Sequence, residues 1–222
     1  MRRRLSGLYF VVDPTMPRER LLKVLGAALR GGVDVVQVWA AWKRTEDSRA
    51  IVDEVARVTR GHGVPLLIND DLDMARKVGA EGVHMDAFEL APSEIRRLLG
   101  EDSIVGYTVG NDLSRVEWAD REGADYVSFC SIFPSPSVAD CEIVPLSIVR
   151  KARGLTSIPI FASGGITLNN AREVLEAGTD GVAIVSAIQK SDDPEATASQ
   201  FRKIIDSALG ARGSGKPGGR LG

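Results

Sequence analysis

The sequence has little cysteine, few aromatic residues and almost no excess of one charge. Two cysteines are too few for a disulfide framework, and the MRRR start lacks the apolar stretch and small-residue cleavage site of a secretory signal. A formal net charge of -2 gives no reason to expect nucleic acid as a partner. No apolar run approaches the roughly 20 residues that cross a bilayer. These absences favour a cytoplasmic protein with no membrane partner.

The chain alternates short apolar runs with amphipathic helical segments. The runs show no polar alternation, which is typical of parallel strands that are covered on both faces. With right-handed crossovers, eight such units in a chain of 222 residues favour a (β/α)8 TIM barrel, and an open doubly wound sheet is the alternative. We expect one barrel domain over residues 1–209 and a disordered tail rich in Gly, Arg and Lys over residues 210–222. The expected strands lie at residues 8–12, 33–39, 64–69, 82–85, 104–107, 125–129, 158–162 and 181–185.

A phosphate-binding pattern follows the last two expected strands. Gly164 and Gly165 come directly after one of them, and paired glycines leave backbone N–H groups uncovered. Val185 and Ser186 end the other and can present further N–H groups to the same point. In (β/α)8 barrels the loops after the seventh and eighth strands commonly hold a phosphate. We therefore expect these four residues to bind a phosphate group.

Polar side chains gather where the third and fourth expected strands end. They are Asn69, Asp70 and Asp71 after the third, and His84, Asp86 and Glu89 at the fourth. Asp70 and Glu89 offer the hard oxygen ligands that suit Mg²⁺, which often takes one or two protein carboxylates plus substrate phosphates. Either Asp70 or Asp71 can instead cap the following helix. We expect Asp71 to be the cap and Asp70 to be functional.

Two other residues at the strand ends have a structural explanation at least as good as a functional one. His84 lies within a strand, so a satisfied structural histidine is as plausible as a catalyst, and we assign it no metal role. Cys130 stands at the end of the sixth expected strand, but no base is evident near it in the sequence. We interpret Cys130 as a buried bystander, and we have no account of Cys141.

Seven blocks, in order, resemble the thiamine phosphate synthase family and its relative, the thiazole tautomerase. The match spans roughly residues 8–205. The resemblance implies a (β/α)8 barrel and a transferase of thiamine biosynthesis. Such an enzyme condenses a hydroxymethylpyrimidine diphosphate with a thiazole phosphate, with Mg²⁺, to give thiamine phosphate and pyrophosphate. The blocks are LYFVVDP, GGVDVVQ, PLLINDDLDMA, GAEGVHM, GADYVSF with IFPSPS, IPIFASGGIT and AGTDGVAIVSAI.

The resemblance also assigns roles to individual residues. It places Asn69, Asp70 and Thr108 at catalytic positions and makes Asp70 and Glu89 the metal ligands, with Glu89 standing where the family usually has Asp. The substrate-binding positions that it implies are Gln37, Ser135, Ser137, Gly164, Gly165, Val185 and Ser186. The implied partners are small phosphorylated heterocycles, without nucleic acid or membrane, and a homo-oligomer is left open.

The chain departs from the family at three cationic positions. The family motif Gln-x-Arg-x-Lys becomes Gln37-Val38-Trp39-Ala40-Ala41, and Thr-x-Thr-Lys becomes Ser135-Pro136-Ser137-Val138. The missing cations therefore fall at Trp39, Ala41 and Val138. Each charge-assisted contact to a phosphate is worth roughly 1.5 to 3 kcal/mol. Trp39 either stacks on a substrate ring or packs in the barrel mouth.

Three functions remain open from the sequence. A divergent thiamine phosphate synthase explains most residues, and we take it as the main prediction. A non-catalytic regulator that binds thiazole or thiamine phosphate would explain the missing cations. An isomerase of another phosphorylated substrate would need His84 or Asp70 as a base. The tautomerase reading lacks its histidine, because that position falls on Gly110.

Overall fold

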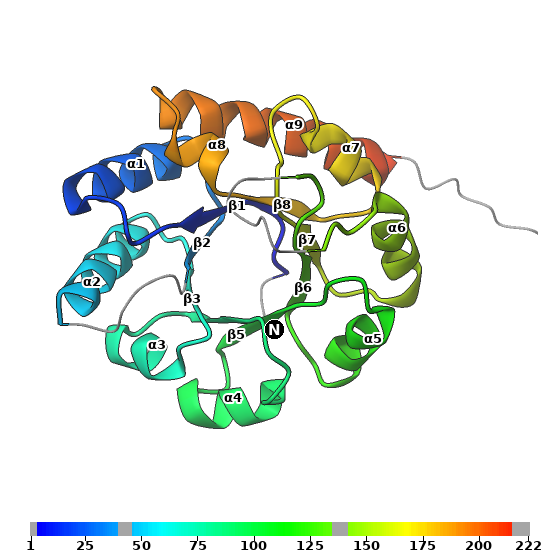
Figure 1. Ribbon diagram of the computed structural model, residues 1–222, viewed down its shortest axis with the longest axis horizontal. Coiled ribbons are helices and arrows are strands. Elements are labelled where there is room, and N and C mark those ends of the chain that lie inside the picture. Colours follow the sequence, from blue (N-terminus) through cyan, green and yellow to red (C-terminus); the bar gives the residue numbers. More distant parts are fainter. Residues whose placement is uncertain (1–3, 40–45, 135–141, 215–222) are drawn as a thin grey trace, which may run out of the picture.

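The computed structural model describes residues 4–39, 46–134 and 142–214. Its strands form a closed parallel barrel in sequence order, surrounded by helices (Figure 1). β1 pairs with both β2 and β8, which closes the ring and excludes the open doubly wound sheet. The strands are β1 (Gly7–Val12), β2 (Val35–Val38), β3 (Leu66–Asn69), β4 (Gly82–Met85), β5 (Ile104–Thr108), β6 (Tyr126–Phe129), β7 (Ile160–Ala162) and β8 (Gly181–Ile184).

Helices follow the strands as the apolar spacing predicts. Between β8 and the last long helix lies one further short helix, α8, where the sequence predicted a single helix. The (β/α)8 prediction is confirmed. The helices are α1 (Arg18–Arg30), α2 (Glu46–Gly61), α3 (Leu72–Val78), α4 (Pro92–Leu99), α5 (Leu113–Arg121), α6 (Leu146–Leu155), α7 (Ala171–Glu176), α8 (Ser186–Gln189) and α9 (Pro194–Ser214).

The strands are buried on both faces, and alternate residues of one strand belong to different parts of the core. Along β1, Leu8 and Phe10 pack in the large cluster that also holds the apolar sides of the helices. Tyr9 and Val11 belong to a smaller cluster inside the barrel. Side chains of a strand point alternately to its two faces, so a continuous apolar run supplies both clusters.

Three aromatic rings fill the middle of the barrel. Tyr9, Tyr126 and Phe161 are at most 1% exposed. Their ring centroids lie 5.3 to 6.0 Å apart, and the rings meet edge to face. Such contacts between rings add to the gain from burial. The barrel interior is therefore a packed core, and not a channel.

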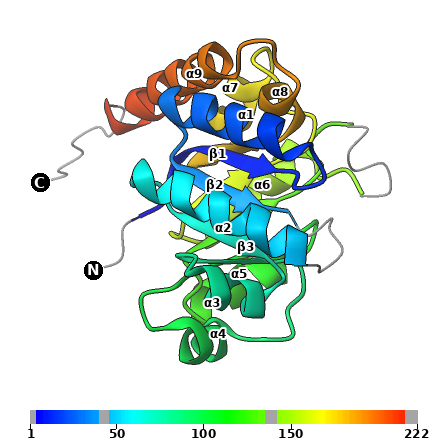
Figure 2. The ribbon, with the colours of Figure 1, turned by 90° about the vertical axis from the view of Figure 1, so that its left-hand side faces the viewer.

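The two ends of the barrel carry different parts of the chain. In Figure 2 the arrow of β1 points to the right, so the carboxyl ends of the parallel strands lie on that side, and α9 ends on the left. α9 continues to Ser214, past the boundary predicted at residue 209, and Arg212 Nη2 in its last turn donates a 2.9 Å hydrogen bond to the Thr179 carbonyl. The predicted tail therefore begins too early, and its residues 215–222 lie outside the described chain. Within the described chain, no helix has the length and apolar character needed to cross a membrane.

Candidate functional site

A cavity of about 420 Å³ opens at the carboxyl ends of the strands. All eight strands or the loops that follow them contribute to its wall. This is the end at which (β/α)8 enzymes carry their active sites. The cavity brings together most of the site residues that the sequence predicted. Those that line it are Gln37, Trp39, Asn69, Thr108, Gly164, Gly165, Val185 and Ser186.

Asp70 sits in a strained turn beside this cavity. Its φ of 49° lies in the left-handed region, which costs a non-glycine residue free energy and is often found at functional sites. Asn69 Nδ2 donates a 3.0 Å hydrogen bond to Asp70 Oδ2. Asp71, the next residue, accepts a 2.9 Å bond from the N–H of Met74 and caps α3. The division of roles predicted for the two aspartates is therefore confirmed for the cap.

The carboxylate that lies against Asp70 is Asp86, and not Glu89. The N–H of Asp86 donates a 2.9 Å bond to Asp70 Oδ1, and Asn69 Nδ2 donates a 3.1 Å bond to Asp86 Oδ2. Asp86 also lines the cavity. Glu89, predicted as the second metal ligand, is exposed and is absent from the cavity lining. Its role as a ligand stays a prediction.

The two aspartates differ in their electrostatic surroundings. Burial raises the pKa of Asp70, and the negative charge of Asp86 raises it further. Burial also opposes ionisation of Asp86, but the nearby His84 and the hydrogen bond from Asn69 lower the pKa of that carboxyl. Two carboxylates in contact repel each other when both are ionised. The pair is therefore a place where a cation would be stabilised.

The donor set fits a magnesium ion that keeps ligands from outside the protein. Asp70 and Asp86 supply carboxylate oxygens, which are the hard ligands Mg²⁺ prefers. Across the described ranges, no group of three or more His, Cys, Asp or Glu side chains could hold a metal. Two carboxylates alone suit Mg²⁺, since this ion commonly completes its shell with water and substrate phosphates. They do not suit a zinc site, which takes three or four protein ligands.

A chain of buried hydrogen bonds runs from Asn69 around the barrel to Thr108. Gln37 Nε2 donates to Asn69 Oδ1 at 3.1 Å, and the Tyr9 hydroxyl donates to Gln37 Oε1 at 2.7 Å. The hydroxyls of Tyr9 and Tyr126 are 2.9 Å apart. Sequence reasoning missed both tyrosines, although the alternation of side chains along their strands could have placed them inside the barrel.

His84 continues this chain on β4. Its Nδ1 lies 2.8 Å from the Tyr126 hydroxyl, and its Nε2 lies 2.8 Å from Thr108 Oγ1. Burial lowers the pKa of His84, against the raising effect of Asp86, while burial raises the pKa values of Tyr9 and Tyr126. The imidazole and both phenols are therefore neutral at neutral pH. The structural reading of His84 is correct in that both of its ring nitrogens have partners, yet the ring also lines the cavity.

The predicted phosphate nest is assembled from the loops after β6, β7 and β8. Gly164 and Gly165 have φ values of +90° and +63°, which only glycine adopts without strain. The carbonyl of Gly164 accepts a 3.1 Å bond from the N–H of Phe133, which fastens the loop. None of the described backbone hydrogen bonds uses the N–H of Gly164 or Gly165. Ser186 begins α8 on the same wall of the cavity.

For Trp39 the sequence left two alternatives open, a place in the substrate pocket or packing in the barrel mouth, and the structure fits both. Its side chain lines the cavity and also packs on the cluster inside the barrel. Among the described residues that line the cavity, there is no Lys or Arg. Cys130, interpreted from the sequence as buried, is only half-buried and lines the cavity, which corrects that interpretation. The predicted residues that lie outside the described ranges are Ala41, Ser135, Ser137, Val138 and Cys141.

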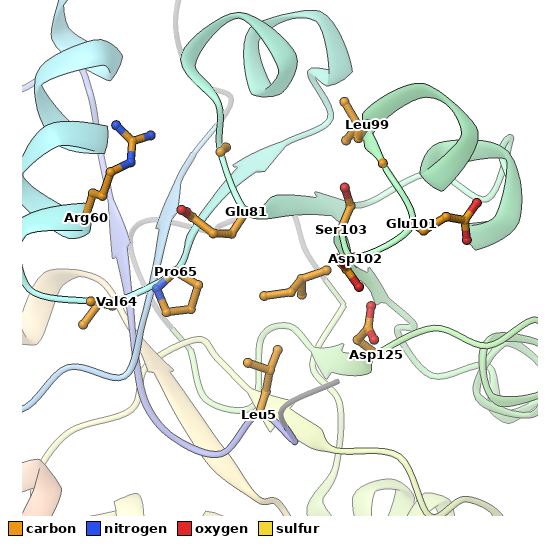
Figure 3. Close-up of a pocket in the computed structure, with 14 residues that line it drawn as sticks. Leu5, Arg60, Val64, Pro65, Glu81, Leu99, Glu101, Asp102, Ser103 and Asp125 are labelled. Carbon is orange, nitrogen blue, oxygen red and sulfur yellow. The ribbon is translucent and has the colours of Figure 1, made fainter. Parts of the chain in front are cut away.

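A second cavity, of about 690 Å³, lies at the opposite end of the barrel (Figure 3). It is larger, but two of its carboxylates, those of Glu81 and Asp125, have structural partners. Glu81 Oε2 accepts a 2.8 Å bond from the N–H of Leu66, and Asp125 Oδ2 accepts 2.7 Å bonds from the N–H of Val105 and from Arg96. These bonds tie together the amino ends of neighbouring strands. We therefore place the chemistry at the smaller cavity, where polar groups from several strands converge at the carboxyl end of the barrel.

The family model and the curated relatives of this chain point to the same kind of protein. Residues 8–188 match the family model described as thiamine monophosphate synthase. A thiamine-phosphate synthase of Halorhodospira halophila is 39% identical over 197 residues, which cover 89% of this chain and 93% of that protein. A thiamine-phosphate synthase of Nitrosococcus oceani is 35% identical over 204 residues, which cover 91% and 94%.

Solved structures agree with this relationship. A thiamine phosphate pyrophosphorylase from Pyrococcus furiosus superposes with a TM-score of 0.81 at 29% identity, and covers 92% of this chain and 97% of that one. A (S)-3-O-geranylgeranylglyceryl phosphate synthase from Thermoplasma acidophilum has a TM-score of 0.67 at 15% identity over 91% and 94%, which shows a common fold alone. The matches to the family model and to both curated relatives extend over most of the chain. The chain belongs to the thiamine monophosphate synthase family.

Proposed function

We propose that this chain joins a hydroxymethylpyrimidine diphosphate to a thiazole phosphate and releases pyrophosphate to form thiamine phosphate. Membership of a family of synthases makes the chain an enzyme and a transferase. The observation that carries the substrate assignment is the meeting of Asn69, Asp86 and the nest around Gly164 in one cavity at the carboxyl end of the barrel. One wall supplies polar groups for a ring, and the other supplies N–H groups for a phosphate.

The reaction needs little acid or base from the protein. Pyrophosphate leaves a carbon next to the pyrimidine ring, and the thiazole nitrogen forms the new bond to that carbon. The protein contributes by holding two substrates in line and by stabilising the charge on the departing group. Gln37, Asn69 and Thr108 hold the pyrimidine in this proposal. Gly164 and Gly165, with Ser186, hold the thiazole phosphate.

A magnesium ion fits the acidic pair beside the cavity. Asp70 and Asp86 would hold it, and Glu89 remains the alternative second ligand from the family resemblance. When bound, Mg²⁺ supplies positive charge at the departing pyrophosphate. The raised pKa of Asp70 supports this assignment, because a cation relieves the repulsion between the two carboxylates. Asn69 keeps both side chains oriented through its two hydrogen bonds.

The purified chain, supplied with both substrates and Mg²⁺, tests the proposed reaction. Thiamine phosphate and pyrophosphate should appear together in equal amounts. The appearance of neither product, at saturating substrates and with Mn²⁺ as well as Mg²⁺, would contradict the proposal. Pyrophosphate without thiamine phosphate would indicate hydrolysis of the pyrimidine substrate and would also contradict it.

Asp70→Asn tests the metal assignment within that assay. The substitution removes a charge but keeps the shape, so the fold should survive while turnover that depends on Mg²⁺ is lost. Asp73→Asn is the matched control. Asp73 lies on the exposed side of α3, where it pairs with Lys77 at 2.6 Å, so its loss should leave turnover unchanged. An Asp70→Asn enzyme that still responds to Mg²⁺ would remove Asp70 from the metal site.

A second function, ligand binding without turnover, is favoured by one observation. The described lining of the cavity holds no Lys or Arg to meet a diphosphate, whereas Gly164, Gly165, Val185 and Ser186, the residues of the predicted phosphate nest, all line it. A regulator would bind thiazole phosphate or thiamine phosphate through the nest alone. Calorimetry with each of these ligands, on the protein that fails the turnover assay, separates a binder from an inactive preparation.

A further inference from the structure

We propose that Tyr9 and Tyr126 are positioning residues that set the tautomer of His84 and, through it, the direction of the Thr108 hydroxyl. In this arrangement His84 carries its hydrogen on Nδ1, and Thr108 presents oxygen lone pairs to the cavity. The site then selects a substrate group that donates a hydrogen bond, such as an amino group or ring N–H of a heteroaromatic ring. Only the identity of the substrate rests on the proposed function.

The direction of donation along this series of hydrogen bonds is fixed at Asn69, beside the two aspartates. A backbone carbonyl accepts hydrogen bonds and donates none, whatever the charge on the carboxyl groups beside it. Asn69 Nδ2 lies 3.0 Å from Asp70 Oδ2, 3.1 Å from Asp86 Oδ2 and 3.3 Å from the carbonyl of His84. The His84 carbonyl can only accept, so the nitrogen of the Asn69 amide must face it, and the same nitrogen donates to the two carboxyl oxygens. Asn69 Oδ1 therefore faces Gln37 as an acceptor.

The donors of the next hydrogen bonds, at Gln37 on β2 and Tyr9 on β1, follow from the orientation of Asn69. Asn69 Oδ1 needs a donor, so Gln37 turns its Nε2 toward it at 3.1 Å. Gln37 Oε1 then faces Tyr9 and accepts the phenol hydrogen at 2.7 Å. A phenol has one hydrogen, and that of Tyr9 is now used. In the 2.9 Å contact between the two hydroxyls, Tyr126 must therefore be the donor.

The hydrogen of Tyr126 is used in turn, so its oxygen can only accept from His84. The contact of 2.8 Å with Nδ1 then places the imidazole hydrogen on Nδ1. A neutral imidazole has one donor nitrogen and one acceptor nitrogen. Nε2 is the acceptor, and its neighbour at 2.8 Å is Thr108 Oγ1. The hydroxyl hydrogen of Thr108 points to His84.

Asp86 competes for the same hydroxyl hydrogen, since Nε2 of His84 lies 3.7 Å from Asp86 Oδ1 and Thr108 lies beside both. A donation from Thr108 to Asp86 would leave the buried Nε2 without a donor. A buried polar group without a partner costs roughly 1 to 3 kcal/mol. Asp86 already accepts from Asn69. The tautomer therefore decides the competition in favour of His84.

Removal of the Tyr9 hydroxyl should reverse the end of the chain. In Tyr9→Phe, the hydrogen of Tyr126 has lost its acceptor, and the nearest remaining one is Nδ1 of His84. His84 then carries its hydrogen on Nε2 and donates to Thr108, which donates to Asp86. The Tyr9 hydroxyl is hydrogen-bonded to Gln37 and Tyr126, so the effect of its loss reaches Thr108 through three hydrogen bonds. Thr108 would still accept, but from His84 and not from a substrate.

Nitrogen-15 NMR of the imidazole measures the tautomer directly, because protonated and unprotonated ring nitrogens have distinct shifts. The chain has two histidines, so His62→Gln assigns the His84 signals. The wild-type protein should show hydrogen on Nδ1, and Tyr9→Phe should show it on Nε2. Tyr107→Phe is the matched control, since it removes another buried phenol. The Tyr107 hydroxyl donates to the Leu90 carbonyl and does not take part in the hydrogen-bond series from Asn69 to Thr108. Its His84 tautomer should be that of the wild type.

The functional readout is the Michaelis constant for the pyrimidine substrate. Tyr9→Phe should raise it roughly five- to tenfold, as expected for one lost hydrogen bond, while Tyr107→Phe leaves it unchanged. A wild-type His84 with hydrogen on Nε2 would overturn the proposal, as would an unchanged tautomer in a folded Tyr9→Phe. If Tyr9→Phe does not fold, the wild-type spectrum alone decides. A predicted tautomer in a protein without turnover would refute the proposed function and leave this inference standing.

Discussion

The backbone N–H of Asp86 donates a 2.9 Å hydrogen bond to Oδ1 of Asp70. This bond joins the loop after β4 to the loop after β3 and holds two acidic residues in contact. β3 and β4 are already paired up to Asn69 and His84. The bond therefore continues the pairing of β3 and β4 into the two loops, and it fixes the position of the Asp70 carboxylate beside Asp86.

Asp86→Asn should weaken Mg²⁺ binding about 10- to 100-fold, because one charge-assisted ligand contact is worth roughly 1.5 to 3 kcal/mol. The bond from the Asp86 backbone to Asp70 survives this change. Glu89→Gln removes an exposed carboxylate that does not line the cavity. The affinity of this variant for Mg²⁺ should therefore stay within a factor of two or three of the wild-type value, or roughly 0.5 kcal/mol. Calorimetric titration with Mg²⁺ compares the two. The reverse order of effects would restore Glu89 as the ligand.

Trp39→Arg should lower the Michaelis constant for the pyrimidine diphosphate about tenfold or more. The described lining of the cavity has no cation, and one guanidinium contact to a phosphate contributes roughly 1.5 to 3 kcal/mol. Trp39→Leu is the control for loss of the ring without a gain of charge. A similar gain in both variants would mean that the indole obstructs the substrate, and no gain in either would mean that charge at this position does not limit binding.

Gly164→Ala should disrupt the nest. A Cβ at this residue would lie 2.5 Å from the Cα of Ser131, and φ is +90°. We expect a stability loss of about 1 kcal/mol or more and weaker binding of thiazole phosphate. Gly154→Ala in α6 is the control, since nothing lies within 4 Å of its Cβ position and alanine favours a helix by up to roughly 1 kcal/mol. Thermal unfolding and calorimetry with thiazole phosphate give the two quantities.

The free energy of unfolding should fall as the pH drops through the titration of His84. Burial lowers the pKa of this residue in the folded state, so the unfolded chain binds more protons between the folded pKa and an unfolded value of about 6.5. Stability therefore rises with pH across that window. His84→Gln should remove this slope, whereas the exposed His62→Gln should keep it. Denaturant unfolding between about pH 5 and 8 measures the slope.

The fold and much of the site follow from local sequence patterns. Apolar runs of strand length, separated by helical stripes, predict a parallel sheet that is covered on both faces, and eight such units favour a barrel over an open doubly wound sheet. Asp71 was identified as a cap because it stands directly before a helix. Gly164 and Gly165 are predicted to belong to a nest because paired glycines near the end of a strand leave backbone N–H groups uncovered.

The carboxylate beside Asp70 could not be found in the same way. The family spacing from His84 pointed to Glu89, but the chain turns directly after β4, and of the two residues it is Asp86 that lines the cavity. The polar roles of Tyr9 and Tyr126 also escaped, since their partners come from strands that are far away in the sequence. Their contact at 2.9 Å depends on the register and curvature of the closed barrel. Such distances are properties of the assembled ring.

The three packed rings of Tyr9, Tyr126 and Phe161 fill the barrel between the cavities at its two ends. Substitutions around the large cavity that Leu5 lines should therefore change stability and leave substrate selectivity unchanged. The molecule can therefore be immobilised through the end of the barrel at which the strands begin. Tethering the chain there to a surface or an electrode would leave the other face open to its substrates.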